Sequence, residues 1–580
     1  MNKIVTLLIF LLTLSLSLSA QKEDYIWLTG YSSNTVDSTV GGTRIDFNTE
    51  PPTVTYEFRE MDFYLADASI CDSAGNLLFY TDATTVMSSN HEIMENGENL
   101  GPHPFHQSYA LDGVVLMQGA IILKLPGEQD SLYIVVHMEF TDDPSSGTFV
   151  SVKRCFYSLV NIHANNGFGE IVQKNQLIVS DSLMTLNIGN LTATRHANGR
   201  DWWVLIPKYL SNEYHTIRIG QNGVEETFSQ TIGMNILSST STQAVFSPDG
   251  SRFARFGIFR FSQPGQIDLY DFDRCSGILN NSLHIPIDTT EEGFVDGGFG
   301  GLAFSPNSQL LYHSRLYKTV QYDLLASNII ASADTVAVYD DFEDPITGFG
   351  TFMGAMQIAP NNKIYMATPT NTRYMHIIHN PDERGAACNF EQHGLPLATF
   401  NDWSVPNYPN YRLGALPDSP CDTIRPIADF SYDSIPTIWF TDLSARTPTR
   451  WQWAFGDGAT SNEQNPLHTY AAAGTYQVCL VASNDAGSDT ICQDVVFTPT
   501  HSHDLTTPLF SIFPNPAQQH ITVSLPDANL RTWQLTNTLG QVIQQGTFTD
   551  SQQVLQLNNK TSGVYFLQVE GLGVERIVVN

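Results

Sequence analysis

The sequence has few charged residues and, among them, few basic ones. Charged side chains make up 15% of the 580 residues, compared with roughly 25% in an average soluble protein. The 59 acidic residues outnumber the 28 basic ones, which gives a net charge of −31. Such a surplus of negative charge repels phosphate groups and anionic headgroups. We therefore expect no nucleic-acid partner and no binding to an anionic membrane surface.

Long apolar runs are absent after the N-terminus. Lys3 precedes an apolar stretch over residues 4–18, and the small residue Ala20 stands before Gln21. This order is typical of a secretory signal peptide that is cleaved on export. The stretch is too short for a stable transmembrane helix. We therefore expect residues 1–20 to be removed and the mature chain to have no transmembrane segment. Because no Cys stands at the cleavage point, we expect no lipid anchor.

Catalytic and cofactor signatures are also absent. The chain contains no GxSxG nucleophile elbow, no Walker loop, no GxGxxG turn and no HExxH pair, each of which carries a defined chemistry. We therefore predict no cofactor and favour a protein that binds a ligand over one that catalyses a reaction. Paired carboxylates from distant loops would leave no such signature. An extracellular glycan-directed hydrolase or lyase, with its site in a propeller funnel, is therefore the alternative.

Cysteine is scarce, and no CxxC pair exists to suggest a zinc ribbon. The seven cysteines are Cys71, Cys155, Cys275, Cys388, Cys421, Cys479 and Cys492. Their odd number leaves at least one unpaired, whereas export permits disulfides among the others.

One disulfide follows from the hairpin around residues 484–487. The sequence Asn-Asp-Ala-Gly at these positions is a turn between two expected strands. Facing residues of an antiparallel pair have numbers with a constant sum, and Cys479 with Cys492 has the same sum as Asn484 with Gly487. The two cysteines therefore face each other, within the reach of a bridge. A second bridge, between Cys388 and Cys421, would tie the end of the first domain to its linker.

The main positive feature is a hairpin pattern that occurs six times. Each copy has an apolar stretch, a turn of Ser/Ala, Pro, Asp/Asn and Gly/Asn, and a second apolar or aromatic stretch. The copies lie at residues 69–82, 122–136, 194–206, 244–255, 302–314 and 356–367. A repeat of roughly 50–60 residues with several strands per unit is typical of propeller blades. The pattern therefore predicts an all-β fold with a β-propeller.

Closure of the propeller sets the number of blades. Radial repetition covers each sheet with its neighbours, whereas an open stack leaves free sheet edges. Residues 22–415, at about 55 residues per blade, predict a seven-bladed propeller, with a six-bladed one as the alternative. Alternating stretches at residues 25–33, 43–48 and 53–58 indicate strands. We expect these strands to complete the final blade by pairing with residues 375–378.

The propeller region also resembles a known group of proteins. Residues 45–49 (IDFNT), 68–82 (ASICDSAGNLLFYTD), 91–97 (HEIMENG) and 270–277 (YDFDRCSG) resemble exported Bacteroidetes proteins that have propellers of the YVTN/quinoprotein-like kind. The resemblance covers most of residues 25–415. It implies the propeller fold and an extracellular location, and it implies no activity.

Residues 416–426 form a proline-rich linker, after which the pattern changes to short strands. Within residues 427–498, the motifs WQWAFGDG (451–458), HTY (468–470) and GTYQVCLV (474–481) closely resemble a PKD domain, an Ig-like β-sandwich. Trp451, Trp453 and Phe455 alternate along a strand, so their side chains should point to one face and form the core of this domain.

A second polar linker spans residues 499–508, and a further small β unit spans residues 509–580. The opening FSIFPNPA (510–517), the strand GVYFLQV (563–569) and the end ERIVVN (575–580) resemble the C-terminal sorting domain of the type IX secretion system. The resemblance implies a small β-sandwich and the type IX secretion machinery as a partner. It also implies passage across the outer membrane, followed by removal of this domain and attachment to the cell surface or release.

One acidic run offers ligands for a cation. Asp340, Asp341, Glu343 and Asp344 lie close together in the sequence, and their oxygens suit a structural Ca²⁺. The spacing of an EF-hand loop is missing. A solvated loop is the simpler interpretation.

Two histidine pairs offer further candidate metal ligands. His103 and His106 lie three residues apart, as do His376 and His379. Pro104 prevents a regular helix at the first pair. Strand alternation sends the members of the second pair to opposite faces.

The modules together predict a secreted cell-surface binding or adhesion protein. The propeller would recognise an extracellular protein or carbohydrate ligand at the channel mouth or on one rim, and the PKD domain would be a spacer or contact module. Because we interpret the repeated turns as scaffold, we expect the ligand to bind at the irregular segments 87–112 and 289–301. The adjacent Trp202 and Trp203 read as blade core.

Overall fold

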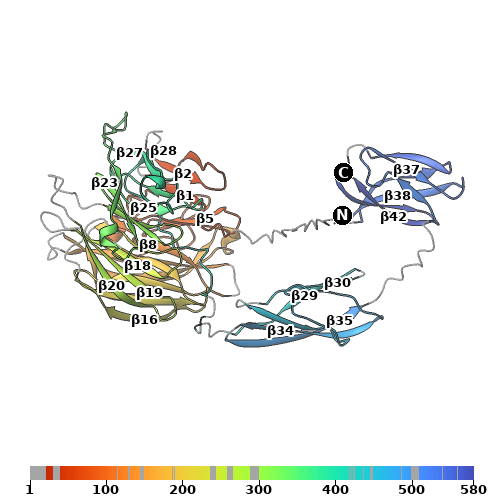
Figure 1. Ribbon diagram of the computed structural model, residues 1–580, viewed down its shortest axis with the longest axis horizontal. Coiled ribbons are helices and arrows are strands. Elements are labelled where there is room, and N and C mark those ends of the chain that lie inside the picture. The colour runs from red at the N-terminus through yellow and green to blue at the C-terminus, as the bar shows by residue number, and fades with distance from the viewer. Residues whose placement is uncertain are drawn as a thin grey trace, which may run out of the picture. The chain divides into compact units, whose positions relative to one another are not determined.

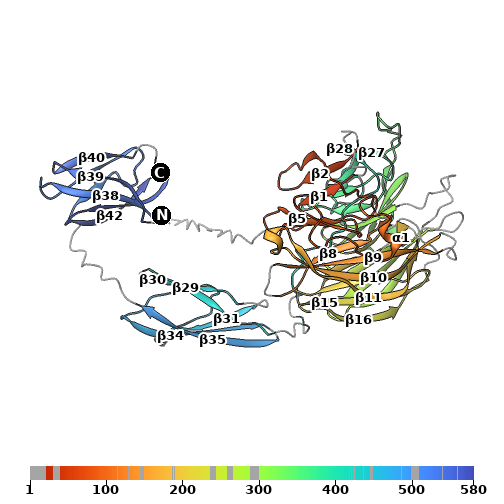
Figure 2. The same ribbon diagram turned by 180° about the vertical axis from the view of Figure 1, so that it is seen from behind.

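The computed structural model shows a chain whose regular secondary structure is almost entirely β-strand (Figures 1 and 2). It describes residues 21–30, 40–113, 115–127, 131–143, 149–185, 187–188, 190–235, 243–257, 265–287, 300–416, 419, 421, 425–435, 437–444, 448–484, 486–497, 509–538, 540–557 and 560–579. The expected signal peptide and the expected linker at residues 499–508 lie outside these ranges. One compact unit comprises residues 1–430, 442–452 and 480–491, and a second comprises residues 431–441, 453–479 and 492–580.

Between residues 26 and 401, the described chain forms seven antiparallel sheets of three or four strands. The first three contain β1 (Ile26–Thr29), β2 (Gly42–Asp46) and β3 (Thr53–Glu57); β4 (Ala68–Cys71), β5 (Leu77–Thr81) and β6 (Val86–Ser88); and β8 (Ala120–Lys124), β9 (Leu132–Asp143), β10 (Phe149–Asn161) and β11 (Glu170–Thr185). The next two contain β13 (Thr192–Arg195), β14 (Trp202–Pro207), β15 (Glu213–Gly220) and β16 (Gly223–Thr231); and β17 (Ala244–Phe246), β18 (Arg252–Gly257), β19 (Gly265–Asp273) and β20 (Ile278–Ile287). The last two contain β21 (Gly300–Phe304), β22 (Leu310–Arg315), β23 (Lys318–Asp323) and β24 (Asp334–Val338); and β25 (Met356–Ile358), β26 (Ile364–Met366), β27 (Thr372–Ile378) and β28 (Phe390–Asn401).

Minor elements connect these sheets. They are the parallel pair β7 (Leu116–Met117) and β12 (Asn187–Ile188), the helix α1 (Pro104–Gln107), and the 3₁₀ turns η1 (Asn165–Gly167), η2 (Ile330–Ser332) and η3 (Gly385–Cys388).

Each of the six repeated hairpins forms the first two strands of a sheet. In the fourth copy, Ala244 pairs with Arg255. Its turn needs Gly250, whose φ is +71°, because residues with a Cβ adopt this conformation at a cost. Asp249 accepts a hydrogen bond from the Ser247 hydroxyl at 2.5 Å, which stabilises the turn.

The sheets are arranged radially, as in a β-propeller. First strands of successive sheets contact each other, including β4 with β8, β13 with β17, β17 with β21, and β21 with β25. The Gln243 side chain connects two of them, since its amide donates to the Met356 carbonyl at 3.0 Å and accepts from the Leu302 amide at 3.1 Å. The number of blades stays a prediction.

The N-terminal sheet closes against the C-terminal one. β28 contacts β2 and β3, and the Thr399 amide donates to the Thr43 hydroxyl at 3.0 Å. The prediction that residues 375–378 pair with strands before residue 68 is wrong. Those residues belong to β27, which lies between β26 and β28 in its sheet. Its pairing with β28 places Ile378 opposite Phe390. The last sheet therefore supplies its own fourth strand, and the N-terminal strands form a sheet of their own.

Trp202 and Trp203 belong to the core. Both are buried, and the Arg195 guanidinium lies 3.7 Å from the centre of the Trp202 ring. Their interpretation as blade core is thus confirmed.

Residues 430–497 form two small sheets. One contains β29 (Phe430–Ile435), β30 (Thr437–Asp442) and β33 (Leu467–His468), and the other contains β31 (Arg450–Ala454), β32 (Thr460–Ser461), β34 (Gly474–Asn484) and β35 (Gly487–Phe497). Trp453 and Phe455 are buried as expected, whereas Trp451 is half-buried. The predicted Cys479–Cys492 disulfide is present, with Cα atoms 4.1 Å apart.

The C-terminal region also forms two sheets. One contains β36 (Ser511–Phe513), β37 (His520–Ser524) and β40 (Gln552–Gln556), and the other contains β38 (Arg531–Asn537), β39 (Val542–Phe548), β41 (Gly563–Val569) and β42 (Gly573–Val579). Inward-facing residues such as Ile521, Trp533 and Leu567 form one buried cluster. These sheets are the small β unit expected from the sequence.

Candidate functional site

A cavity of about 190 Å³ lies among the first strands of four neighbouring propeller sheets. Its walls come from β13, β17, β21 and β25 and from residues 407–412. Lining side chains that are only partly buried are Val245, Phe246, Pro248, Pro306, Gln357, Ile358 and Asn410. The cavity therefore combines apolar walls with amide groups and is accessible from solvent.

The repeated hairpin turns contribute directly to this cavity. Ser247 and Pro248 line it from one turn, and Pro306 and Asn362 line it from the next two. Residues 87–112, one of the two segments expected to hold the ligand, contribute no lining residue. Most of the other segment, residues 289–299, lies outside the described residues. The turns of the repeat thus line the cavity as well as join the blade strands.

Residues 405–412 lie among the innermost strands and hold them together. The Asn407 side-chain amide donates to the carbonyls of Ala120 at 2.8 Å and Leu191 at 2.9 Å. Its oxygen accepts from Gln118 at 3.3 Å. The Tyr411 hydroxyl donates to the Ile122 carbonyl at 2.6 Å. Because these contacts reach two separate sheets, this segment fixes the positions of the first strands around the cavity.

The two charged side chains among the lining bind each other. Arg412 donates two hydrogen bonds to Asp24, at 2.6 and 2.7 Å. Asp24 is buried, and the Arg412 side chain is partly exposed. This bidentate geometry satisfies both charges, so neither is available as a free acid or base in the cavity.

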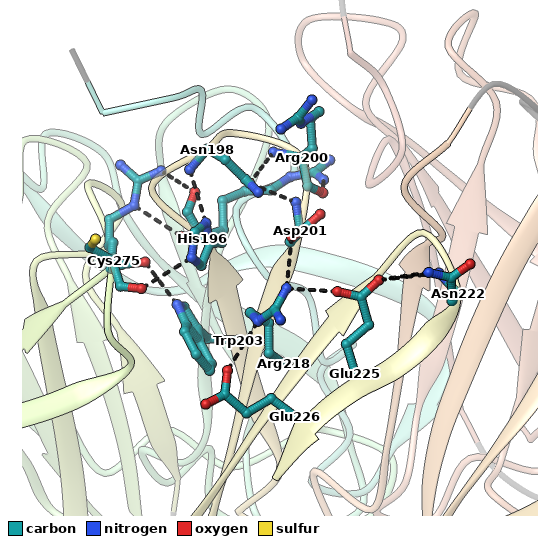
Figure 3. Close-up of polar contacts among 12 residues, drawn as sticks. His196, Asn198, Arg200, Asp201, Trp203, Arg218, Asn222, Glu225, Glu226 and Cys275 are labelled. Atoms are coloured by element: carbon teal, nitrogen blue, oxygen red, sulfur yellow. Dashed lines mark hydrogen bonds and ion pairs between the residues drawn. The ribbon is translucent and has the colours of Figure 1, made fainter. Parts of the chain in front are cut away.

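A polar network holds the turn that joins β13 to β14 (Figure 3). The first of these strands, β13, lines the cavity. Asn198 accepts from the amide of Asp201 at 2.9 Å. The buried Asp201 carboxylate pairs with Arg218 at 3.3 Å, and Arg218 also binds Glu225 at 2.7 Å. Arg218 further contacts Glu226 at 3.2 Å. The turn is thereby fixed to β15 and β16.

The same turn is joined to the neighbouring sheet. The ring of His196 contacts the Cys275 carbonyl through Nε2 at 3.1 Å, and the Trp203 indole donates to the Arg274 carbonyl at 2.8 Å (Figure 3). Burial lowers the pKa of His196, so its ring is neutral at pH 7 and holds this contact as a hydrogen-bond donor.

The chain leaves the propeller over this region, and a disulfide fixes it there. Leu416 donates to the Ala197 carbonyl at 2.8 Å. Cys421 forms a disulfide with Cys275, with Cα atoms 5.5 Å apart. The expected Cys388–Cys421 bridge is therefore wrong. The Gly414 carbonyl accepts from the guanidinium of Arg274, which lies in the β19–β20 turn that carries Cys275, whereas Cys388 is a buried free thiol within an apolar cluster.

The acidic run does not converge on one point. Asp344 is buried and accepts from the amides of Ile346 at 2.8 Å and Arg373 at 2.9 Å. Asp340 instead pairs with His393 at 3.0 Å. Asp341 and Glu343 join neither contact, and none of the four belongs to the one group of metal-ligand residues found in the described ranges. The loop thus uses two of these four carboxylates, those of Asp340 and Asp344, for structural contacts.

The two members of each histidine pair also lie in different surroundings and do not share a site. His106 is buried, contacts the Ala83 carbonyl at 3.1 Å and has a pKa lowered by burial to about 4, whereas His103 lies 3.7 Å from Asp142. His376 is buried, and His379 contacts Glu391 at 2.6 Å. Each histidine thus has its own protein partner.

The group that does converge was missed from the sequence. Asp181, Glu213 and His215 each place one metal-ligand atom within 4.8 Å of the others. Glu213 and His215 lie two apart on one strand face, which is a weak signal. Asp181 comes from another sheet, and no local spacing in the sequence indicates that it lies near the other two.

Comparison with known families identifies two domains. Residues 436–498 match the PKD domain family, and residues 511–580 match the secretion system C-terminal sorting domain family. Both resemblances noted in the sequence are confirmed. A C-terminal domain of this kind directs a protein through the type IX secretion system. The chain is therefore secreted across the outer membrane to the cell surface or the extracellular space.

Individual relatives match the chain only in part. A segment of 44 residues is 43% identical to collagenase ColQ1 of Bacillus cereus (strain Q1), and it covers 8% of this chain and 5% of the collagenase. Among solved structures, the PKD1 domain of the Vibrio cholerae metalloprotease PrtV is 32% identical, covers 13% of this chain and 98% of its own, and has a TM-score of 0.13. A putative 6-phosphogluconolactonase from Bacteroides fragilis NCTC 9343 is 12% identical over 66% of this chain and 98% of its own, with a TM-score of 0.37.

None of the helices in the described part of the chain has the length and apolarity needed to cross a bilayer.

Proposed function

We propose that this secreted protein binds an extracellular protein or carbohydrate through its propeller. The domain arrangement proposed is a propeller at residues 22–415, a PKD domain at residues 427–498 that acts as spacer or contact module, and a sorting domain at residues 509–580. The observation that carries the proposal is the solvent-accessible cavity at the hairpin turns, whose walls combine apolar side chains with amides.

The size of the cavity limits what it holds. Its volume of about 190 Å³ equals about six water molecules at about 30 Å³ each, which is less than most small-molecule sites. A protruding unit of a larger ligand, such as one side chain or one sugar, fits this space. The surrounding turns then supply the remaining contact area, as expected of a binding or adhesion protein.

The cavity's charges also favour binding over hydrolysis. Glycoside hydrolysis needs two carboxyl groups that flank the scissile bond. The described lining offers one carboxylate, Asp24, which is already bound to Arg412. The amides of Gln357 and Asn410 are the groups we assign to ligand recognition.

The test combines a glycan and peptide array with a hydrolysis screen on the secreted protein. Val245→Trp fills the cavity and should weaken binding of any captured ligand by more than about tenfold, since filling the site removes its contacts. Val338→Trp is the matched control, because Val338 is exposed on β24. Equal binding by a folded Val245→Trp variant would refute the site. Turnover of a polymer would refute the binding-only function.

A further inference from the structure

A second cluster of charged side chains lies apart from the cavity, where two neighbouring sheets meet. Asp181 comes from β11, and Glu213 and His215 come from β15. Their ligand atoms lie within 4.8 Å of one another. Two donors bound to one tetrahedral Zn²⁺ at about 2.0–2.2 Å lie about 3.3–3.6 Å apart, and Asp181 Oδ2 and His215 Nε2 are already 3.4 Å apart. A contraction of at most about 1.5 Å in the widest pair would therefore bring all three onto a single ion.

The buried imidazole of His215 points into this cluster. His215 is 7% exposed, and its Nδ1 contacts the Ser229 hydroxyl at 3.1 Å. Its Nε2 has no hydrogen-bond partner, although Asp181 Oδ2 lies 3.4 Å away. Buried polar atoms normally have a partner. A second group that orients the ring through the other nitrogen is the usual arrangement around a metal-binding histidine.

Lys208 already places a positive charge between the two carboxylates. Its Nζ lies 2.9 Å from Asp181 Oδ2 and 3.1 Å from Glu213 Oε2. The Lys208 side chain is 28% exposed and has a flexible stem, so it can turn outward into solvent. The geometry and the negative charge of the cluster therefore suit a cation.

We propose that Asp181, Glu213 and His215 form a binding site for a divalent transition-metal ion of the Zn²⁺ class, and that Lys208 is displaced when the ion binds. Carboxylates and a neutral imidazole are ligands that Zn²⁺ accepts, whereas Ca²⁺ and Mg²⁺ prefer oxygen alone. Because β11 and β15 belong to different sheets, the ion cross-links two neighbouring sheets of the propeller.

Isothermal titration of the metal-stripped secreted protein with ZnCl₂ tests this site, with CaCl₂ and MgCl₂ titrated in parallel. We expect Zn²⁺ to bind and the two other ions to bind at least about 100-fold more weakly, given the imidazole ligand. His215→Ala and the nearly isosteric Asp181→Asn should each weaken Zn²⁺ binding by more than about 100-fold, since each removes a direct ligand. The matched control is His284→Ala, because His284 also contacts an aspartate, Asp268, at 3.0 Å.

Lys208→Met is the decisive variant, because loss of structure cannot increase affinity. Removal of the competing ammonium should tighten Zn²⁺ binding about tenfold. The proposal is overturned if wild type and Lys208→Met both fail to bind Zn²⁺. It is equally overturned if Lys208→Met binds no more tightly than wild type, or if Asp181→Asn binds as wild type does. Weaker binding by His284→Ala would also overturn it, since the ion would then sit elsewhere.

Discussion

Replacement of Asn407 by Leu tests whether residues 405–412 hold the propeller sheets together. Leu keeps the approximate volume of the side chain but removes its two donated hydrogen bonds, to the carbonyls of Ala120 and Leu191, and the bond it accepts from Gln118. Asn407 is 6% exposed, so water does not replace the lost partners. A buried polar group left without its partner costs about 1–3 kcal/mol, and these groups together should cost about 3 kcal/mol.

The expected shift in melting temperature follows from the size of the propeller. Unfolding entropy is about 2.1 cal/mol/K per residue, which gives about 0.8 kcal/mol/K for a body of about 400 residues. A loss of about 3 kcal/mol therefore lowers the Tm by about 4 °C. Differential scanning calorimetry of the secreted protein measures this shift. Asn280→Leu, at an exposed position of β20, should change the Tm by less than 1 °C. Equal Tm values for the two variants would refute the role of Asn407.

Three further predictions concern the disulfide, pH and export. Joint replacement of Cys275 and Cys421 by Ser opens a loop whose ends are 146 residues apart; the chain-entropy treatment gives a loss of about 5 kcal/mol, and denaturant unfolding that shows no loss would contradict it. Burial lowers the pKa of His106 to about 4 from 6.5, so the unfolded chain binds the proton more readily and stability should fall as pH drops from about 6.5 to about 4. His106→Phe should flatten the dependence of Tm on pH, His284→Gln should not, and equal slopes would argue against this origin. Deletion of residues 509–580 should leave the protein in the periplasm, and cell fractionation that still finds it at the surface would exclude the sorting role.

Features that depend on neighbouring residues were predictable from the sequence. The six hairpins follow from turn residues such as Gly250 and Asn362, both of which have positive φ. The Cys479–Cys492 disulfide follows from the position of one turn. The PKD and sorting domains carry long ordered motifs. In each case, residues within a short stretch determine the local structure.

Features that depend on distant segments were not predictable. Cys388 and Cys275 were equally available to Cys421, and the contacts of Gly414 and Leu416 with Arg274 and Ala197 decided between them. We expected the strands before residue 68 to pair with β27. Nothing in their sequence indicates that β28 pairs with this strand instead. Asp181 joins Glu213 and His215 only because two sheets are adjacent. Side-chain periodicity contains no information about such adjacency.

The join between the two ends of the propeller has a consequence for the order of folding. Thr43 meets Thr399, and Asp24 meets Arg412, across separations of 356 and 388 residues. An exported chain emerges with its N-terminus first. The first sheet therefore lacks its partners Thr399 and Arg412 until the end of the propeller region has been exported. Contacts of such long range are slow to form because the entropy of loop closure comes first. We therefore expect the ring to close only after residue 412 has been delivered, and a truncated chain to keep open sheet edges that pair with other chains.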